Sequence, residues 1–385
     1  MQTDAVSRFL RYCVWTVAAV ALTGCSMFSR SDKRFEPAEL TQYPAAIAAR
    51  QAWSASIGSG SAYGFAPDVV GDAVYAATPN GNVVKVALGS GQVLWQTQAG
   101  MRLSAGAGSD GRTTAVAAAD GTVIAFDDQG QEKWRTKATS EVSIPPAVGA
   151  GIVAVRSTDY RTQAFDAETG DLRWSVQRPG PALALKTSMQ MQIVQNLLFT
   201  GLPNGRIMAI DTASGAVQWE GTVSTSQGAT DLDRISDVVG APQMQGPLMC
   251  GVTYQGRIGC FDLSQGGYPV WTQPFSSTTG MAVDPVHAYA TDHRDTVVAF
   301  SLIDGEDSWR QDALRNRRLT APVVVPQAVA VGDLEGYVHF LSREDGRLLG
   351  RLQVGGGAIL SPLTATPRGV LVQTGSGNLV MVEVN

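Results

Sequence analysis

A glycine followed four residues later by a tryptophan recurs along almost the whole chain. The pairs are Gly91/Trp95, Gly130/Trp134, Gly170/Trp174, Gly215/Trp219, Gly267/Trp271 and Gly305/Trp309. Successive tryptophans of this series are 39, 40, 45, 52 and 38 residues apart. Each glycine closes a tight turn between two predicted strands, as in the segment 165–174. A repeat of about forty residues that is built from strands is typical of a β-propeller.

A second series of turns lies half a repeat away from the tryptophans. It gives an independent count of the repeats. Six of these turns end in glycine, and Asn-Gly and Asp-Gly favour two-residue hairpins. They are Asn80-Gly81, Asp120-Gly121, Asn204-Gly205, Gln255-Gly256, Glu335-Gly336 and Ser376-Gly377. Tyr160-Arg161 and Arg294-Asp295 occupy the equivalent places in two further repeats without glycine. The sequence therefore predicts eight hairpins.

The tryptophan-bearing strands also number eight, provided that two exceptions are included. Gly350 stands where the tryptophan after Gly346 is expected, and Trp53 lies far upstream of the first hairpin. We therefore predict an all-β, eight-bladed propeller of four-stranded antiparallel blades over residues 50–385. The strand around Trp53 completes the blade that the hairpin at Gly377 begins, which closes the ring and leaves no end blade with an unpaired edge.

The start of the chain reads as an export signal. Arg8 and Arg11 precede an apolar run over residues 14–22, which is too short for a comfortable membrane span. The run ends in Leu22-Thr23-Gly24-Cys25, which resembles a bacterial lipobox. The resemblance implies removal of residues 1–24, lipidation of Cys25 and, since Ser26 follows, sorting to the outer membrane. Residues 25–49 are then a lipidated tether. An ordinary signal peptide that carries a cysteine near its end stays open as the alternative.

Charge argues against nucleic acid as a partner. The chain has 29 Lys and Arg against 34 Asp and Glu, a formal net charge of −5. Neutralising phosphates needs clustered basic residues, which this sequence lacks.

Two cysteines remain after the signal and the anchor, Cys250 and Cys260. Export to the periplasm permits a disulfide. If Gln255-Gly256 is a two-residue hairpin, however, Cys250 lies opposite Phe261 and the two sulfurs point to opposite faces of the strand pair. We therefore expect two buried thiols. The alternative is a bulge in the hairpin, which would bring the two sulfurs to the same face and allow a disulfide.

The sequence has no recognisable catalytic or metal-binding constellation. The three histidines, His287, His293 and His339, lie in different repeats without ligand spacing. No serine stands in a Gly-x-Ser-x-Gly elbow. Asp231, Asp233 and Asp237 lack the turn glycine and the bidentate glutamate of a calcium loop. We predict a protein that is not an enzyme and has no cofactor.

With its lipobox, eight predicted blades and repeated Asp-x-x-x-Gly-x-x-x-Trp motif, the chain resembles propellers with a tryptophan-docking motif. One branch comprises the quinoprotein alcohol dehydrogenases, which hold pyrroloquinoline quinone (PQQ) and calcium. The other is the BamB family of outer-membrane assembly lipoproteins, which has the repeats and no cofactor. The chain is similar to the BamB family over essentially its whole length. Three segments carry this similarity beyond the repeats: residues 181–186, 228–239 and 332–339.

The resemblance implies that two loops bind BamA through one of its periplasmic POTRA domains. The residues so indicated are Leu183, Leu185, Lys186, Asp231, Asp233, Arg234 and Asp237. The same loops also stand out without the resemblance, because they lie in the two longest intervals of the repeat. Leu183 and Leu185 are expected to present an apolar pair, with the charged residues as polar rim contacts. Two positions depart from the family pattern: Lys186 replaces Arg, and Val239 replaces Asp.

The leading hypothesis is therefore a non-enzymatic scaffold of the outer-membrane β-barrel assembly (BAM) complex. It is anchored through Cys25, faces the periplasm, and contacts BamA, other BAM components and unfolded outer-membrane protein precursors. Two alternatives stay open. One is a propeller lipoprotein that binds another envelope partner. The other is a PQQ-dependent dehydrogenase, against which the sequence lacks an adjacent Cys-Cys pair and the calcium-binding residues of that branch.

Overall fold

The computed structural model describes residues 35–58, 60, 63–181 and 183–384. The chain separates into a short unit, Met1–Ala38, and a large unit, Glu39–Asn385. The predicted signal peptide and Cys25 lie outside the described residues, so the limits predicted for the signal and the tether remain predictions. Among the described residues no helix is long and apolar enough to cross a membrane.

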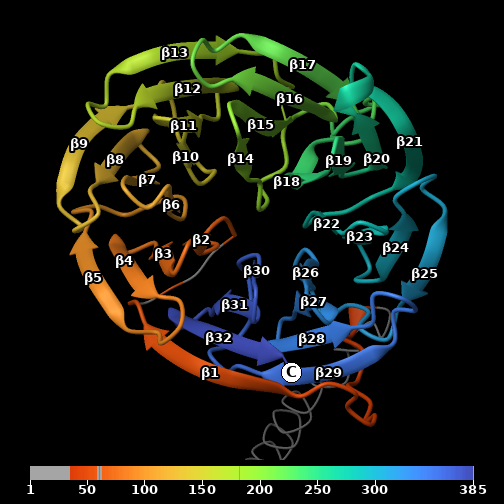
Figure 1. Ribbon diagram of the computed structural model, residues 1–385. Coiled ribbons are helices and arrows are strands. Elements are labelled where there is room, and N and C mark those ends of the chain that lie inside the picture. The colour runs from red at the N-terminus through yellow and green to blue at the C-terminus, as the bar shows by residue number, and fades with distance from the viewer. Residues whose placement is uncertain (1–34, 59, 61–62, 182, 385) are drawn as a thin grey trace, which may run out of the picture. The chain divides into compact units, whose positions relative to one another are not determined.

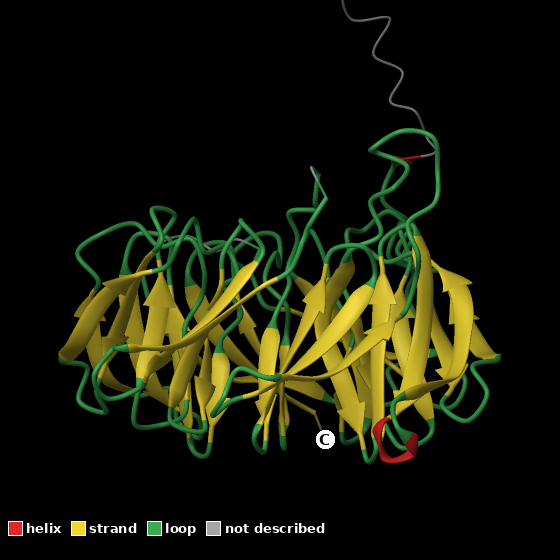
Figure 2. Ribbon diagram, turned by 90° about the horizontal axis from the view of Figure 1, so that it is seen from above, coloured by secondary structure: helices red, strands yellow, loops and turns green. Residues whose placement is uncertain are grey.

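The large unit is a closed ring of eight four-stranded antiparallel sheets (Figure 1). This confirms the predicted all-β, eight-bladed propeller. The first strand of each blade faces the centre of the ring and the fourth forms its outer wall. The crossings from each outer strand to the next blade lie on one face, uppermost in Figure 2, which we call the upper face. The chain ends at the opposite, lower face.

Blades 1 to 4 contain the following strands, from the centre outwards. Blade 1 has β2 (Asp68–Val70), β3 (Ala73–Ala77), β4 (Asn82–Ala87) and β5 (Val93–Gln98). Blade 2 has β6 (Gly108–Ser109), β7 (Thr114–Ala117), β8 (Thr122–Phe126) and β9 (Glu132–Lys137). Blade 3 has β10 (Ala147–Gly149), β11 (Ile152–Arg156), β12 (Arg161–Asp166) and β13 (Leu172–Gln177). Blade 4 has β14 (Met191–Val194), β15 (Leu197–Leu202), β16 (Arg206–Asp211) and β17 (Val217–Thr222).

Blades 5 to 8 complete the ring. Blade 5 has β18 (Val238–Gln245), β19 (Leu248–Thr253), β20 (Gly256–Asp262), a short 3-10 helix η2 (Leu263–Gln265) and β21 (Tyr268–Phe275). Blade 6 has β22 (Met281–Val283), β23 (His287–Thr291), β24 (Val297–Ser301) and β25 (Asp307–Gln311). Blade 7 has β26 (Val323–Val325), β27 (Ala328–Gly332), β28 (Tyr337–Leu341) and β29 (Leu348–Gln353). Blade 8 has β30 (Thr364–Thr366), β31 (Gly369–Gln373), β32 (Asn378–Val384) and β1 (Ala49–Ser56).

Blade 8 joins the two ends of the propeller. Strand β1 pairs antiparallel with β32, from Ala49 opposite Val384 to Ser56 opposite Asn378. The predicted closure of the ring by the strand around Trp53 is therefore confirmed.

The hydrophobic core lies between the blades. The described residues form eight buried apolar clusters, and each cluster combines side chains of two neighbouring blades. All residues of strands such as β3 and β11 are buried because both faces of the sheet pack against neighbours. The outer strands instead vary in exposure along their length, as in β9, where Trp134 is buried between half-buried Lys133 and exposed Arg135. Each blade is thus stabilised by its neighbours.

Tryptophans attach seven of the eight outer strands to the following blade. Every indole Nε1 donates a hydrogen bond to a main-chain carbonyl in the turn between the third and fourth strands of the next blade, with N···O distances of 2.8–3.1 Å. The donor and acceptor residues are Trp53/Leu88, Trp95/Asp128, Trp134/Ala167, Trp174/Thr212, Trp219/Gly267, Trp271/Leu302 and Trp309/Arg343.

The glycine of the repeat is required at this contact for two reasons. Gly170 has a left-handed backbone (φ +78°), which side-chain-bearing residues rarely adopt. A Cβ atom at Gly170 would also lie 2.7 Å from the ring of Trp134. The periodic glycine and the tryptophan of the preceding blade therefore form one interaction.

Gly350 replaces the eighth tryptophan for a structural reason. A tryptophan there would dock on a turn between the third and fourth strands of blade 8. These two strands are β32 and β1, which are the last and first strands of the propeller. No turn therefore connects them. Residues 40–47 lie over this part of β29 instead. The N–H of Ala46 donates to the carbonyl of Leu349 (2.7 Å), and a Cβ at Gly350 would lie 3.1 Å from the carbonyl oxygen of Ile47.

The hairpins between the second and third strands have three-residue loops, and the two-residue loops that we predicted are wrong. In blade 1 the N–H of Thr78 donates to Asn82 and that of Gly81 donates back to Thr78, which leaves residues 79–81 as the loop. Its third residue, Gly81, is left-handed (φ +91°), as in hairpins that end in a bulge. Tyr160 (φ +62°) and Asp295 (φ +64°) adopt the same conformation without being glycine.

This register corrects the expectation of free thiols. In blade 5 Cys250 pairs directly with Cys260 across β19 and β20, and the two form a disulfide. A shift of one residue reverses the face of every side chain in a strand. The predicted hairpin loop was one residue too short, so it placed the two sulfurs on opposite faces.

Shortening a docked tryptophan tests the inter-blade contact. We expect Trp174→Ala to lower the free energy of unfolding by about 3–5 kcal/mol, because a buried ring and its hydrogen bond to Thr212 are lost. Urea unfolding followed by circular dichroism measures this change. Leu172→Ala on the same strand is the control, since Leu172 is 54% exposed and the expected change is within about 0.5 kcal/mol. Equal effects of the two substitutions would contradict the docking role.

The disulfide is tested by alkylation and mass spectrometry. After unfolding in denaturant without reductant, Cys250 and Cys260 are expected to stay unmodified by a maleimide, and reduction should expose both. Unfolding is essential, because two buried free thiols would also resist alkylation in the native protein. Modification of both cysteines without reductant would show that the bridge is absent.

Candidate functional site

Two crossings on the upper face contain the residues that the sequence singled out. The first is the 178–190 loop between β13 and β14, and the second is the 223–237 loop between β17 and β18. Both belong to the face uppermost in Figure 2, where the longer loops of the ring gather. Residue 182 of the first loop is not among the described residues.

The two loops are joined to each other. The N–H of Leu185 donates to the Asp237 carboxylate, with an N···Oδ2 distance of 2.6 Å. Met189 forms an isolated parallel bridge with Gly240, whose N–H donates to the carbonyl of Ser188 (3.1 Å). The 178–190 loop is therefore fixed against the start of blade 5.

Asp237 is buried, so the expectation that it is an exposed rim contact is wrong. The sequence pattern did not distinguish it from the exposed acids nearby, although it directly precedes the buried strand β18. Burial raises the pKa of Asp237, while the hydrogen bond from Leu185 and the charge of Arg156 act in the opposite direction. Its carboxylate positions the main chain of the 178–190 loop.

The three residues of the first loop differ in exposure. Leu183 is 43% exposed, whereas Leu185 is half-buried and packs against the core between blades 5 and 6. Lys186 points into solvent, and its Nζ lies 3.6 Å from a carboxylate oxygen of Glu141. A surface ion pair of this kind contributes little to stability. Leu183 and Lys186 are thus accessible to a partner, and Leu185 supports them.

The charged residues of the second loop are exposed but have different contacts. Asp233 accepts hydrogen bonds from the N–H (3.1 Å) and the hydroxyl (2.7 Å) of Thr230, which hold the pKa of Asp233 below its usual value. Arg234 Nε donates to the carbonyl of Gly228 (3.1 Å). Asp231 makes no hydrogen bond or ion pair within the described part of the chain. Asp233 and Arg234 therefore shape the loop, and Asp231 is available for intermolecular contact.

Sequence reasoning missed three residues of this site. Leu232 is 66% exposed in the second loop. Its position as an apolar residue between Asp231 and Asp233 was the sequence signal that could have identified it. Tyr160 donates from its hydroxyl to the carbonyl of Pro181 (2.9 Å) and supports the first loop from the blade 3 hairpin. Arg156 is buried beneath the loops and donates to Thr200 Oγ1 (3.0 Å). Burial lowers the pKa of Arg156 to about 10, so it stays charged at neutral pH.

A cavity of about 290 Å³ lies beside the first loop. Its lining includes Ile144, Arg156, Tyr160, Leu185 and Met189. Within the described residues, no group of three or more His, Cys, Asp or Glu side chains is arranged to hold a metal ion. The geometry is that of a supported apolar surface with charged neighbours, as in a protein-binding loop.

Comparison with known proteins gives a consistent family. The family model described as outer membrane protein assembly factor BamB matches residues 79–311. The chain is 58% identical over 385 residues to the outer membrane protein assembly factor BamB of Bordetella pertussis, with 100% of both chains covered. It is 38% identical over 363 residues to that of Burkholderia pseudomallei, covering 94% of this chain and 95% of the relative.

Solved structures agree on the fold. The crystal structure of BamB from Moraxella catarrhalis superposes with a TM-score of 0.80 at 24% identity, covering 87% of this chain and 100% of that one. A quinohemoprotein alcohol dehydrogenase from Comamonas testosteroni superposes with a TM-score of 0.65 at 14% identity, covering 87% and 76%, and shares the fold alone. On the strength of its relatives and of the matched family model, the chain belongs to the BamB family of outer membrane protein assembly factors.

Proposed function

We propose that this protein is a non-enzymatic scaffold of the BAM complex that binds BamA through the 178–190 and 223–237 loops. Family membership supports the place in the complex. The observation that carries the site is the hydrogen bond from Leu185 to buried Asp237, which fixes one loop against the other while Leu183 stays exposed.

The supported loop suits an interface because little conformational freedom is lost on binding. A contact surface that is already ordered avoids the entropic cost of arranging flexible side chains and main chain. Leu183 and Leu232 are the exposed apolar anchors in this proposal. Lys186 and Asp231 act at the rim, where charges set orientation and association rate more than affinity.

The proposed location is the periplasmic side of the outer membrane, with the lipid anchor at Cys25. Removal of residues 1–24 and acylation of Cys25 carry over from the lipobox. Contact with unfolded outer-membrane protein precursors is part of the proposal, because an outer strand that no other segment covers leaves main-chain groups that can accept an added strand.

Truncating the apolar pair tests the interface. We expect Leu183→Ala combined with Leu185→Ala to abolish recovery of BamA when the lipidated protein is purified from envelope membranes. The change removes the exposed anchor Leu183 and the side chain of Leu185 that supports it, and such a loss at the centre of an interface typically costs several kcal/mol of binding free energy. Leu172→Ala, an exposed leucine on β13, is the matched control and should retain BamA. Undiminished recovery with an intact fold would move the interface elsewhere on the ring.

The positioning role of Asp237 gives a separate prediction. Asp237→Ala removes the acceptor for Leu185, and we expect it to weaken BamA binding more than Asp231→Ala does, by about 1–3 kcal/mol. Asp237→Asn keeps an oxygen acceptor and should restore most of the affinity. Titration of the purified proteins measures all three variants. A larger effect of Asp231→Ala would mean that the exposed acid, and not the buried one, dominates.

A further inference from the structure

A second cavity on the upper face has a composition that the proposed BamA contact does not explain. It has a volume of about 380 Å³, toward the lower end of the range of about 300–1,000 Å³ for ligand pockets. Its lining comes from segments that precede the innermost strands β2, β14, β22, β26 and β30, together with hairpin residues of blades 6 and 7. The cavity therefore lies on the upper face beside the innermost strands, which face the centre of the ring in Figure 1.

The wall of this cavity is mainly apolar. The apolar lining residues from blades 6, 7 and 8 are Leu319, Ala321, Leu334, Ile359, Leu360 and Pro362. Ile359 and Leu319 are buried and give the wall a fixed shape, because they belong to the cores between blades. Such a wall matches an apolar side chain.

The charged lining residues are mainly basic, although the chain as a whole has a formal charge of −5. Arg318, Lys186 and His293 line the cavity, and Asp295 is the one acid among the lining residues. Both oxygens of Asp295 are occupied, since they accept the N–H groups of Arg318 and Leu319 at 2.8 Å each. Arg318 and Lys186 carry two positive charges against the one negative charge of Asp295, so the described lining offers net positive charge to a ligand.

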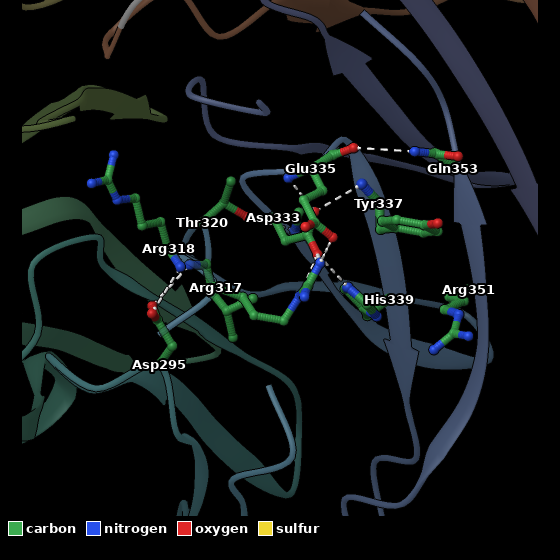
Figure 3. Close-up of polar contacts among 12 residues, drawn as sticks. Asp295, Arg317, Arg318, Thr320, Asp333, Glu335, Tyr337, His339, Arg351 and Gln353 are labelled. Carbon is green, nitrogen blue, oxygen red and sulfur yellow. Dashed lines mark hydrogen bonds and ion pairs between the residues drawn. The ribbon is translucent and has the colours of Figure 1, made fainter. Parts of the chain in front are cut away.

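The main chain holds Arg318 in place, and the charge of its guanidinium acts on Asp295 without a hydrogen bond between the two side chains. Its backbone is left-handed (φ +52°), an unusual conformation for a residue with a side chain. Figure 3 shows its side chain extending away from the neighbouring cluster, while its N–H faces Asp295. No described residue accepts a hydrogen bond from the Arg318 guanidinium. Strained residues of this kind concentrate at functional sites.

A buried cluster of charged and polar side chains fixes the residues next to Arg318. Arg317 Nε donates to Asp333 Oδ2 (2.8 Å), which also contacts His339 Nε2 at 2.9 Å (Figure 3). Asp333 also accepts the N–H groups of Glu335 and Tyr337, both at 2.9 Å. Arg317 and Asp333 thus join the segment before β26 to the hairpin of blade 7. These contacts hold the backbone at Arg318 in its unusual conformation.

The neutral polar residues of the lining carry hydroxyl groups. They are Thr187, Ser188, Thr278, Thr279 and Thr320. The Thr279 hydroxyl is enclosed and has no hydrogen-bond partner within the described residues.

We propose that this cavity binds an extended acidic segment of a partner protein, with an apolar side chain against Ile359 and Leu360 and an adjacent carboxylate on Arg318. Charge complementarity selects this occupant, because a guanidinium pairs with a carboxylate through two parallel hydrogen bonds. The site adds a second contact on the upper face to the proposed scaffold function. It does not require BamA to be the partner.

The test uses a fluorescein-labelled heptapeptide with a central leucine flanked by glutamates, titrated with the mature protein. A peptide with lysines in place of the glutamates and one with serine in place of the leucine are the matched probes. We expect Arg318→Glu to weaken binding of the glutamate peptide by about 10- to 100-fold. Ala358→Trp, which places a large side chain in the cavity, should weaken it comparably. Arg347→Glu is the charge-matched control on the lower face and should have no effect.

The outcomes separate this proposal from the proposed BamA contact. Leu183 does not line the cavity, so Leu183→Ala should leave peptide binding unchanged even where it reduces BamA recovery. The proposal is overturned if the wild type does not bind the glutamate peptide at up to about 1 mM. It is also overturned if the lysine peptide binds equally, or if Arg318→Glu and Arg347→Glu behave alike. Circular dichroism of each variant establishes that the propeller is intact.

Discussion

The docking of one tryptophan on the glycine turn of the next blade is the interaction on which the rest of this structure depends. A four-stranded blade cannot bury both of its faces alone, and every apolar cluster of the ring is shared by two blades. The indole covers the turn and its N–H satisfies a main-chain carbonyl there, as Trp134 does at Ala167. This contact recurs at seven of the eight interfaces, and it fixes the spacing and the direction of successive blades. At the remaining interface, β1 and residues 40–47 supply the connection.

The rigid ring holds the ends of the upper-face loops in place. A crossing between blades can be long without weakening the core, because its ends are held by packed strands. The 178–190 loop illustrates this, since it is tied to the 223–237 loop through Leu185 and Asp237. The segment 316–320 illustrates it again, since Asp295 accepts the N–H groups of Arg318 and Leu319 while Asp333 holds the side chain of Arg317. In both places a carboxylate organises main chain so that a different side chain is presented to solvent.

The fold was predictable from sequence and the details of the site were not. The glycine and tryptophan repeat identified the blades, and the position of Trp53 identified the closure, because both are periodic consequences of a single contact. The predicted hairpin register was wrong by one residue. A three-residue loop with a left-handed third position has the same Asn-Gly sequence as a two-residue turn. That error separated Cys250 from Cys260. Asp237 was mistaken for a surface acid because an isolated carboxylate carries no sequence mark of burial. Arg318 was missed because its role arises from backbone conformation and from residues 23 positions away.

The central claim is that the exposed end of the 178–190 loop contacts BamA. Site-specific photo-crosslinking in living cells tests it most directly, with a photoreactive phenylalanine derivative at position 183 of the full-length chain. Ile303, which is 83% exposed in a lower-face turn, is the matched position on the opposite side of the ring. We expect a BamA adduct from position 183 and none from position 303. A BamA adduct from position 303 together with none from position 183 would contradict it.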